Sequence, residues 1–310
     1  MDCSVIIPIR NEYPQIIFTI DSIFQEFKRC GLKGEVIAVF NENTDDGYEI
    51  LSKKVKLSNL KVLVSEEGQC AARLMGMENA QSEMLFFFDA HMLIEPFSFN
   101  KMISAFEDSS EKLGAGFFSI RYLLSVDTIY YGYSPLVKNF WGTWTDKKCH
   151  SIPYHMPLSG AAGYAIKRSA CIDSGFYNKN FGCYGGGEPY LFYKLEMFGY
   201  TNFVNPDAIA AHLAAARGYF WDYDILYRNF LLASFILGGE RFSDVYYYIY
   251  KKRCNGIDIY LKKLEEIYNE VKKTGEEDHK FVMSRKIKSV REVSSAYNYD
   301  NRVIKMKRDS

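Results

Sequence analysis

Two residues near position 90 have the types and spacing that suit a divalent metal ion. Asp89 and His91 directly follow the apolar run Met84–Phe88, which has the length and composition of a buried strand. Side chains alternate along an extended chain, so Asp89 and His91 point to the same side. They leave the carboxyl end of the strand, where open α/β sheets bind ligands. One carboxylate and one imidazole form half of a metal site, and such mixed ligands favour Mn²⁺ over Mg²⁺ or Ca²⁺.

A second explanation of Asp89 and His91 needs no metal. In this explanation Asp89 caps the next helix, and His91 is an ordinary histidine on the surface. The third candidate ligand is His212, a lone histidine among small apolar residues. Histidines in such segments are more often part of a core than ligands. Its role therefore depends on whether the fold brings it to Asp89 and His91.

A glycine run supplies another candidate site. Gly185, Gly186 and Gly187 precede Glu188 and a helix-like segment. Glycines let the backbone approach a ligand closely, and a glutamate is favoured at a helix N-terminus. The alternative is a loop followed by an ordinary first-turn glutamate.

The predicted strands and helices that must position these residues indicate an α/β protein. Short apolar runs alternate with segments of helical periodicity over the first hundred residues, which predicts a doubly wound sheet. Residues 125–157 show no clear period and predict a long loop. We expect the following strands and helices: strands at 3–9, 35–40, 61–64, 84–88, 114–122 and 159–166, and helices at 13–30, 70–80 and 188–198.

The composition indicates a large buried core and gives no general argument for a nucleic-acid or membrane partner. Of the 310 residues, 48% are hydrophobic and 16% aromatic, and Lys plus Arg equals Asp plus Glu at 38 each. The seven cysteines form no C-x-x-C pair, which predicts reduced thiols and no structural zinc. The first residues lead directly into a strand, and the apolar run 230–239 is too short for a bilayer. We therefore expect a cytoplasmic protein without a signal peptide or transmembrane segment.

The order of the motifs resembles the catalytic domain of the polypeptide N-acetylgalactosaminyltransferases. As in that family, residues 68–76 (GQCAARLMG) precede a strand that ends in Asp-x-His. Downstream, the family's elements are matched by residues 157–168 (PLSGAAGYAIKR), 175–177 (GFY) and 186–188 (GGE), and His212 falls where the family has its last metal-binding histidine. Residues 5–12 (VIIPIRNE) resemble the opening strand of GT-A glycosyltransferases more widely. The resemblance covers about residues 3–217.

This resemblance implies a fold and a set of roles. Residues 1–218 would form a GT-A catalytic domain, a Rossmann-like mixed sheet flanked by helices. Asp89, His91 and His212 would hold Mn²⁺, with Mg²⁺ as the alternative, against the donor diphosphate, and Glu188 would be the catalytic residue. The nucleotide sugar would contact Pro8, Arg10, Glu12, Asn41, Gly68, Arg73, Asp89, Gly186 and Gly187.

Departures from the family pattern leave the donor and the stereochemistry open. The acidic pair that ends the family's second strand is Phe40-Asn41 here, so UDP is the expected nucleotide but is not fixed. Gly185 and Pro189 replace the tryptophan and asparagine that flank Gly-Gly-Glu. The resemblance favours retention of configuration, whereas in an inverting enzyme Glu188 would act as general base.

Residues 219–310 lie outside the resemblance and predict a helical extension with a basic C-terminal tail. An apolar stripe runs from Ile257 to Val271 at helical spacing. From His279 onward there are nine basic and three acidic residues. The segment after Tyr297 is polar, which predicts either a disordered tail or, with Tyr297 and Tyr299, contacts to nucleic-acid phosphates.

We therefore predict a metal-dependent hexosyltransferase that uses a nucleotide-diphosphate sugar. The acceptor is either a surface glycan or its lipid-linked precursor, or hydroxymethylated DNA. The alternative is a non-catalytic module that binds a sugar nucleotide, which would apply if the metal ligands did not come together. A sugar nucleotidyltransferase is disfavoured because residues 8–12 (PIRNE) replace the glycine-rich, basic loop expected after its first strand. The sequence does not predict the oligomeric state.

Overall fold

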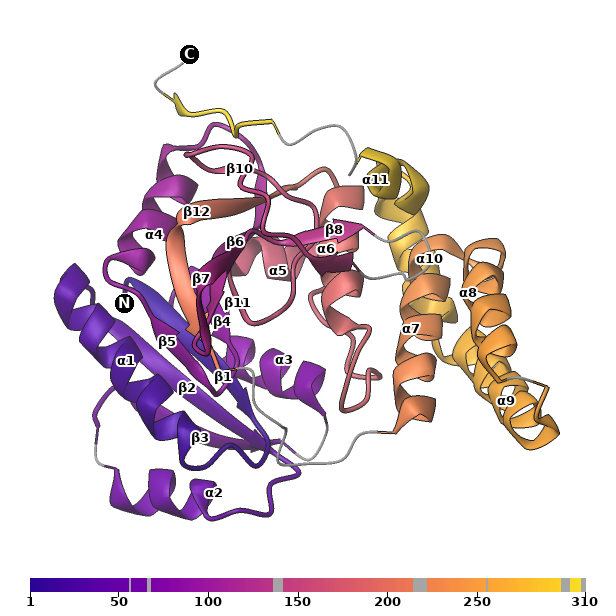
Figure 1. Ribbon diagram of the computed structural model, residues 1–310, viewed down its shortest axis with the longest axis horizontal. Helices are drawn as coiled ribbons and strands as arrows, with labels where there is room; N and C mark the ends of the chain where they lie inside the picture. The colour runs from indigo at the N-terminus through magenta and orange to yellow at the C-terminus, as the bar shows by residue number, and fades with distance from the viewer. Residues whose placement is uncertain are drawn as a thin grey trace.

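The computed structural model describes all residues except 56, 66–67, 136–141, 214–221, 255, 297–301 and 308–310. A ten-stranded mixed sheet lies at the centre of the described chain, with helices on both faces (Figure 1). The strand order is β10-β12-β6-β11-β4-β1-β2-β3, with β5 beside β12 and β7 beside β6. Strands β8 and β9 form a separate two-stranded sheet.

The first four strands form the parallel half of the sheet. β1 pairs with both β2 and β4, and β2 pairs with β3. The strands and helices predicted before residue 89 are confirmed to within two residues at each end. These elements are β1 (Cys3–Ile9), α1 (Gln15–Cys30), β2 (Gly34–Asn41), α2 (Gly47–Glu49), a π-helical turn (Ile50–Lys54), β3 (Leu60–Ser65), α3 (Gln69–Asn79) and β4 (Met84–Phe88).

Two hydrophobic cores lie on opposite faces of this sheet, because neighbouring residues of each strand point in opposite directions. Val5 and Ile7 of β1 pack with α1 and with the helix that begins at Ser98. Ile6 packs on the other face, in the core that includes α3 and the later helices. Both faces are therefore covered, as a parallel sheet requires.

The second half of the sheet is largely antiparallel and departs from the prediction in two places. The segment 125–157, expected to be a long loop, contains four short strands, β7 to β10. The strand that ends at His212 was missed because its alanines, asparagines and proline have low strand propensity. The elements are β5 (Met92–Ile94), α4 (Ser98–Asp108), β6 (Leu113–Tyr122), β7 (Ser125–Tyr130), β8 (Tyr133–Pro135), β9 (Gly142–Trp144), β10 (Tyr154–His155), β11 (Gly163–Lys167), α5 (Arg168–Ser174), α6 (Gly187–Met197) and β12 (Thr201–His212).

The helical extension packs against α6 and shares its core, which includes Leu231 of α7 and Val271 of α9. Figure 1 shows these helices, in orange, beside the sheet domain. None of the helices in the described residues combines the length and apolar character needed to cross a bilayer. The five helices are α7 (Tyr223–Gly238), α8 (Glu240–Arg253), α9 (Asp258–Thr274), α10 (Glu276–Arg285) and α11 (Val290–Ala296).

The last described segment, 302–307, returns to the central sheet and is not a free tail. Ile304 is 1% exposed and belongs to the core that contains α1 and α4. Arg302 forms a bidentate ion pair with Glu111, with both N–O distances 2.6 Å. The expectation of a disordered tail is therefore wrong for these residues, whereas Tyr297 and Tyr299 lie outside the described chain.

Truncation of Ile304 tests whether the returning segment stabilises the fold. Ile304→Ala should lower the free energy of unfolding by about 2–4 kcal/mol, because it removes buried methyl groups and leaves a cavity. Urea denaturation measures the change. Ile172→Ala, at a residue that is 65% exposed, is the matched control and should alter stability by less than about 0.5 kcal/mol. Equal stabilities for the two variants would contradict the docking of the segment.

The Arg302–Glu111 pair predicts a pH dependence of stability. Burial alone would raise the pKa of Glu111, but hydrogen bonds from Arg302, the Lys305 backbone and Thr201 lower it from 4.5 to about 2. The pair therefore stabilises the fold above about pH 4.5, and this contribution is lost as the pH falls toward 2. Arg302→Gln should cost about 1 kcal/mol at neutral pH, a small value because Arg302 is partly exposed.

The difference between the wild type and Arg302→Gln should shrink when urea denaturation is repeated below pH 4.5. Arg241→Gln, at an exposed arginine of α8, should show no such trend. A difference that stayed constant down to acid pH would show that Glu111 is not the partner.

Candidate active site

The backbone of two paired strands brings the three candidate metal ligands together. Asp89 follows β4, and His91 lies just before β5. β5 pairs antiparallel with the end of β12 and places His212 opposite Met92. The backbone nitrogen of Leu213 also donates to the carbonyl of His91 at 3.1 Å. The pairing of β5 with β12 therefore holds His212 beside His91 across more than a hundred residues of sequence.

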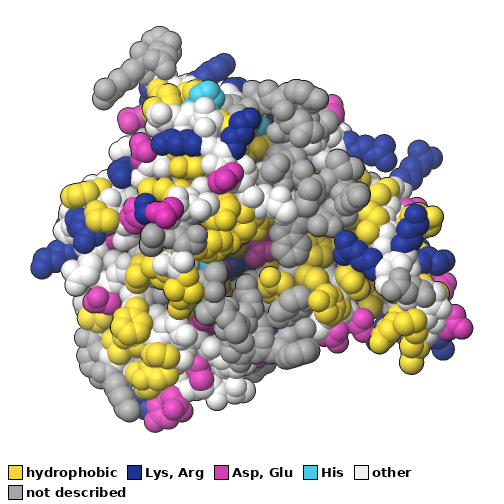
Figure 2. All heavy atoms as spheres, viewed as in Figure 1, with side chains coloured by type: hydrophobic (Ala, Val, Ile, Leu, Met, Phe, Trp, Pro, Cys, Tyr) yellow, Lys and Arg dark blue, Asp and Glu magenta, His cyan; other side chains and the backbone are white. Residues whose placement is uncertain are grey.

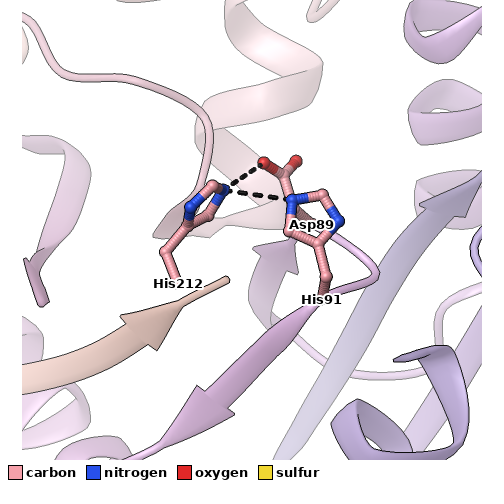
Figure 3. Close-up of side chains that lie close together, drawn as sticks. All are labelled: Asp89, His91 and His212. Carbon is pink, nitrogen blue, oxygen red and sulfur yellow. Dashed lines mark hydrogen bonds and ion pairs between the residues drawn. The ribbon is translucent and has the colours of Figure 1, made fainter. Parts of the chain in front are cut away.

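The three side chains point toward one another, as Figure 3 shows. Their nearest ligand atoms all lie within 4.8 Å of one another. His91 Nε2 lies 3.1 Å from His212 Nε2, and His212 Nε2 lies 3.5 Å from Asp89 Oδ2. Adjacent ligands of one ion, each bonded at about 2.1 Å, are separated by about 3 Å. The predicted convergence of Asp89, His91 and His212 is confirmed.

The protonation pattern of the two histidines leaves space for a cation between them. His91 Nδ1 lies 3.0 Å from Glu12 Oε2. A carboxylate only accepts, so His91 donates to Glu12 through Nδ1, and in the neutral imidazole the lone pair then lies on Nε2. His212 Nε2 faces this lone pair and the Asp89 carboxylate, so either a proton or a metal ion must lie there. Two imidazole nitrogens and one carboxylate oxygen fit a divalent transition metal.

The Asp89 carboxylate is held in its charged form. Burial alone would raise its pKa, but the hydrogen bond from His212 and the charges of His91, His212 and Arg73 lower it below its usual range. An ionised carboxylate is the form that binds a metal. Asp89 is therefore ready to act as a ligand near neutral pH.

Arg73 of α3 lies behind the site and connects its two carboxylates. It is 1% exposed, and its guanidinium lies 3.1 Å from Glu188 Oε1 and 3.9 Å from Asp89 Oδ1. The ring of Tyr177 lies 5.4 Å from the guanidinium carbon. Arg73 does not line the cavities described below, in contrast to the nucleotide contact expected from the sequence. In this structure it fixes Asp89 and Glu188 relative to each other.

Two cavities meet at Asp89. The narrower one, about 30 Å³, is lined by five of the expected nucleotide-binding residues, Pro8, Arg10, Glu12, Asn41 and Asp89. The larger one, about 210 Å³, contains Glu188 and His212. Figure 2 shows a hollow near the centre of this face, with acidic, basic and histidine side chains at its bottom. The three candidate metal ligands thus lie at the boundary between the two cavities.

The loops around the narrow cavity are fixed by their own hydrogen bonds. Asn11 and Glu42 adopt positive φ angles of 53° and 46°, which non-glycine residues adopt only at some cost. Asn11 Oδ1 accepts from the backbone of Thr44 at 2.7 Å, and Asn43 Oδ1 accepts from the backbone of Asn11 at 2.7 Å. These bonds join the loop after β1 to the loop after β2. The cavity walls are therefore formed before any ligand binds.

The three remaining glycines of the predicted set allow close packing. A side chain at Gly68 would lie 2.8 Å from the backbone of Gly182, and one at Gly187 would lie 2.4 Å from Cys70 Sγ. Gly186 has a φ of 78° and would place a side chain 2.6 Å from the carbonyl oxygen of Asn229. These glycines do not line the two cavities. They bring the loop before Glu188 close to α3 and α7.

Sequence reasoning missed two groups of residues at the site. Glu12 was expected at the nucleotide, but its contact with His91 had no signal in the spacing, because 79 residues separate them. The larger cavity also contains aromatic and amide side chains that no motif indicated. These are Gln69, Tyr122, Tyr133, Trp144 and Tyr184. Two of them, Tyr133 and Trp144, lie in the segment 125–157, which was expected to be a long loop.

Comparisons with known proteins agree with this geometry. Residues 4–123 match the sequence model of glycosyl transferase family 2. A comparison with curated protein sequences finds no match. Among solved structures, the chain is similar to GalNAc-T7 determined with UDP, GalNAc and Mn²⁺ (TM-score 0.65, 17% identity, 88% of this chain and 56% of that chain). This chain thus corresponds to about half the length of GalNAc-T7.

Two further structures have the same fold. One is the mannosyltransferase PcManGT from Pyrobaculum calidifontis in complex with GDP-Man and Mn²⁺ (TM-score 0.56, 17% identity, 86% of this chain and 73% of that chain). The other is S. aureus TarS 1–349 (TM-score 0.57, 14% identity, 96% of this chain and 91% of that chain). At these identities the likeness establishes the fold alone.

The fold and the matched segment define a class. The chain has the GT-A fold of glycosyltransferases, with a C-terminal helical extension, and the family match supports sugar transfer. Within that class, it resembles the catalytic domain of the polypeptide N-acetylgalactosaminyltransferases, as the order of its motifs predicted.

His212→Ala should abolish tight Mn²⁺ binding, because it removes one of the three candidate ligands and leaves only Asp89 and His91. Glu12→Gln should weaken binding about 10- to 100-fold, since it removes the carboxylate that orients His91. Calorimetry with Mn²⁺ on His212→Ala and Glu12→Gln measures both effects. His150→Ala is the control, because His150 packs on Tyr154 outside the site. Unchanged Mn²⁺ affinity in His212→Ala would exclude the metal assignment.

Proposed function

We propose that the protein is a metal-dependent glycosyltransferase that moves a sugar from a nucleotide-diphosphate donor to an acceptor hydroxyl. The single observation that carries the proposal is the meeting of Asp89, His91 and His212 at the boundary of two cavities. A site for a nucleoside diphosphate sugar needs this order: nucleotide on one side, metal at the diphosphate, and sugar on the other side. A UDP-sugar is the proposed donor, and Mn²⁺ the proposed ion.

The residues of the chain have separable roles in this proposal. Asp89, His91 and His212 would hold the ion, which as a Lewis acid would stabilise the charge of the departing nucleoside diphosphate. Glu12 orients His91 through its hydrogen bond. Pro8, Arg10 and Asn41 line the cavity in which the diphosphate and nucleotide would lie.

Glu188 is the proposed catalytic residue, because it lines the larger cavity next to Asp89. Its Oε1 accepts a hydrogen bond from Arg73 at 3.1 Å, so the carboxylate is held in one orientation. This arrangement suits a carboxylate that orients the sugar and the acceptor. We accordingly propose retention of configuration, with general-base catalysis and inversion as the alternative. The anomeric configuration of the product, read by proton NMR, distinguishes the two.

A donor screen tests the proposal. The protein is incubated with Mn²⁺ and each sugar nucleotide in turn, and free nucleotide is measured. Slow release of UDP from one or more UDP-sugars is expected, and chelation of the metal should stop it. The alternative, a non-catalytic sugar-nucleotide-binding module, predicts calorimetric binding of the donor without release under any condition.

Glu188→Gln should reduce turnover by about 100-fold or more, because it removes a charge that acts on the reacting groups. Donor affinity, measured by calorimetry with Mn²⁺ present, should change little. Glu78→Gln, at an exposed glutamate of α3, is the matched control and should retain full activity. Near-normal turnover of Glu188→Gln would remove this residue from the chemistry.

A further inference from the structure

The larger cavity contains an aromatic wall as well as the proposed sugar-transfer centre. Its lining includes Asp89, Glu188 and His212, and the cavity volume is about 210 Å³. Four of its other lining residues carry aromatic rings, Tyr122, Tyr133, Trp144 and Tyr184. The Tyr122 ring centroid lies 5.7 Å from that of His212, whereas Tyr133 and Trp144 pack on each other and form the aromatic wall. This wall plays no part in the function proposed above.

The rings of Tyr133 and Trp144 are held by a hairpin. The two residues are direct partners in the register of β8 and β9, and their ring centroids lie 4.7 Å apart in an edge-on arrangement. The backbone nitrogen of Tyr133 donates to the carbonyl of Leu158 at 3.0 Å, and that of Thr145 donates to the carbonyl of Gly132 at 3.0 Å. The first bond ties the hairpin to the backbone at Leu158, and the second joins its two strands next to the aromatic pair. The aromatic pair is therefore positioned by main-chain hydrogen bonds.

Gly160 packs directly against this aromatic wall. A side chain at Gly160 would lie 2.7 Å from the Trp144 ring and 2.7 Å from the Tyr133 hydroxyl. Any larger residue would therefore displace the pair. Gly160 lines the same cavity, as do Ala161 and Ala162, which follow it. The close packing of Gly160 therefore helps to fix the two rings in the cavity wall.

The charged residues in the lining of the cavity favour one of the two acceptor classes, a glycan, over the other, hydroxymethylated DNA. Among the residues that the structure describes, the lining includes the carboxylates of Asp89 and Glu188 and no lysine or arginine. A nucleic acid needs cations to neutralise its phosphates, although its bases can stack on aromatic rings. In addition, Arg302, in the described part of the basic tail, is already paired with Glu111. The cavity therefore favours a neutral ligand with one apolar face and several hydroxyl groups, a description that fits a pyranose ring.

We propose that Trp144 and Tyr133 form an acceptor subsite that takes a neutral pyranose unit of a glycan, and that Gly160 allows the two rings to take their place in the cavity wall. This inference rests on the proposed function, since it assigns the acceptor of the same reaction. The apolar face of the pyranose packs on the aromatic wall, and its hydroxyl groups point toward Gln69 and Glu188. The acceptor hydroxyl would thus be presented to the donor sugar next to Asp89.

Binding and transfer with simple glycosides test the subsite. Methyl glycosides of common neutral hexoses are added with Mn²⁺ and UDP, and their contact with the protein is followed by saturation-transfer NMR. At least one glycoside should bind the wild type. Trp144→Ala should weaken that binding about 10-fold, and Trp144→Phe should restore most of it, because a flat ring is retained. Gly160→Val should also weaken binding, since a side chain at this position would displace the Trp144 and Tyr133 rings while it leaves both residues in the sequence.

The controls separate the subsite from the donor site and from folding. UDP affinity and slow donor hydrolysis should change less than twofold in Trp144→Ala, Trp144→Phe and Gly160→Val. Tyr260→Ala, at an exposed aromatic of α9, should bind the glycosides normally. Thermal melts check that each variant is folded. If Trp144→Ala does not fold, Trp144→Phe and Gly160→Val still test the subsite.

Several outcomes would overturn the inference. If Trp144→Ala altered donor hydrolysis as much as glycoside binding, the aromatic wall would belong to the donor site. If no glycoside bound but a hydroxymethylated duplex did, the acceptor would be DNA. Absence of nucleotide release with every donor would refute the proposed function, and with it the role of the subsite as an acceptor site. Glycoside binding would still be measured separately, because the NMR experiment needs no turnover.

Discussion

The burial of the Arg73 guanidinium is the constraint on which the site depends. A fully buried cation is stable only when carboxylates and polarisable groups surround it. Asp89, Glu188 and Tyr177 supply these groups here. Burial alone would lower the pKa of Arg73, but Tyr177 and Glu188 raise it well above its usual value, so the arginine stays charged.

This one cation connects three elements that are distant in sequence. Arg73 belongs to α3, Asp89 follows β4, and Glu188 starts α6. A shift of any of these elements would leave a charge buried without its partner, at a cost of several kcal/mol. The relative positions of the metal ligand and of the proposed catalytic carboxylate are therefore set by electrostatics within the protein, before donor or metal arrives.

The fold could be predicted from the sequence where local patterns were strong. The apolar runs at β1 and β4 and the periodic segments at α1 and α3 gave correct elements, because burial on two faces leaves a clear pattern. β12 was missed, although it carries His212, because alanines, asparagines and a proline do not indicate a strand. Its place in the sheet comes from pairing with β5 and β6, a long-range effect that no local pattern contains.

Some residues of the candidate site could likewise be predicted from the sequence, and others could not. Asp89 and His91 could be found from spacing, and His212 and Glu188 from the order of motifs within a resemblance. The aromatic wall and the contact of Glu12 with His91 could not be found, since they arise from the packing of a hairpin and two loops. Arg73 was found as a residue of the site, but its burial between two carboxylates depends on the final positions of three elements.

The return of residues 302–307 to the sheet domain has a mechanical consequence for the helical extension. The extension is joined to the catalytic sheet at its start through β12 and α7, and again at its end through Ile304 and the Arg302–Glu111 pair. A segment attached at one end can rotate about its attachment point. A segment attached at both ends is restrained in its movement relative to the sheet. The five helices can therefore transmit force or strain to the edge of the sheet at β10 and β12, and they cannot separate from it unless the terminal anchor is released first.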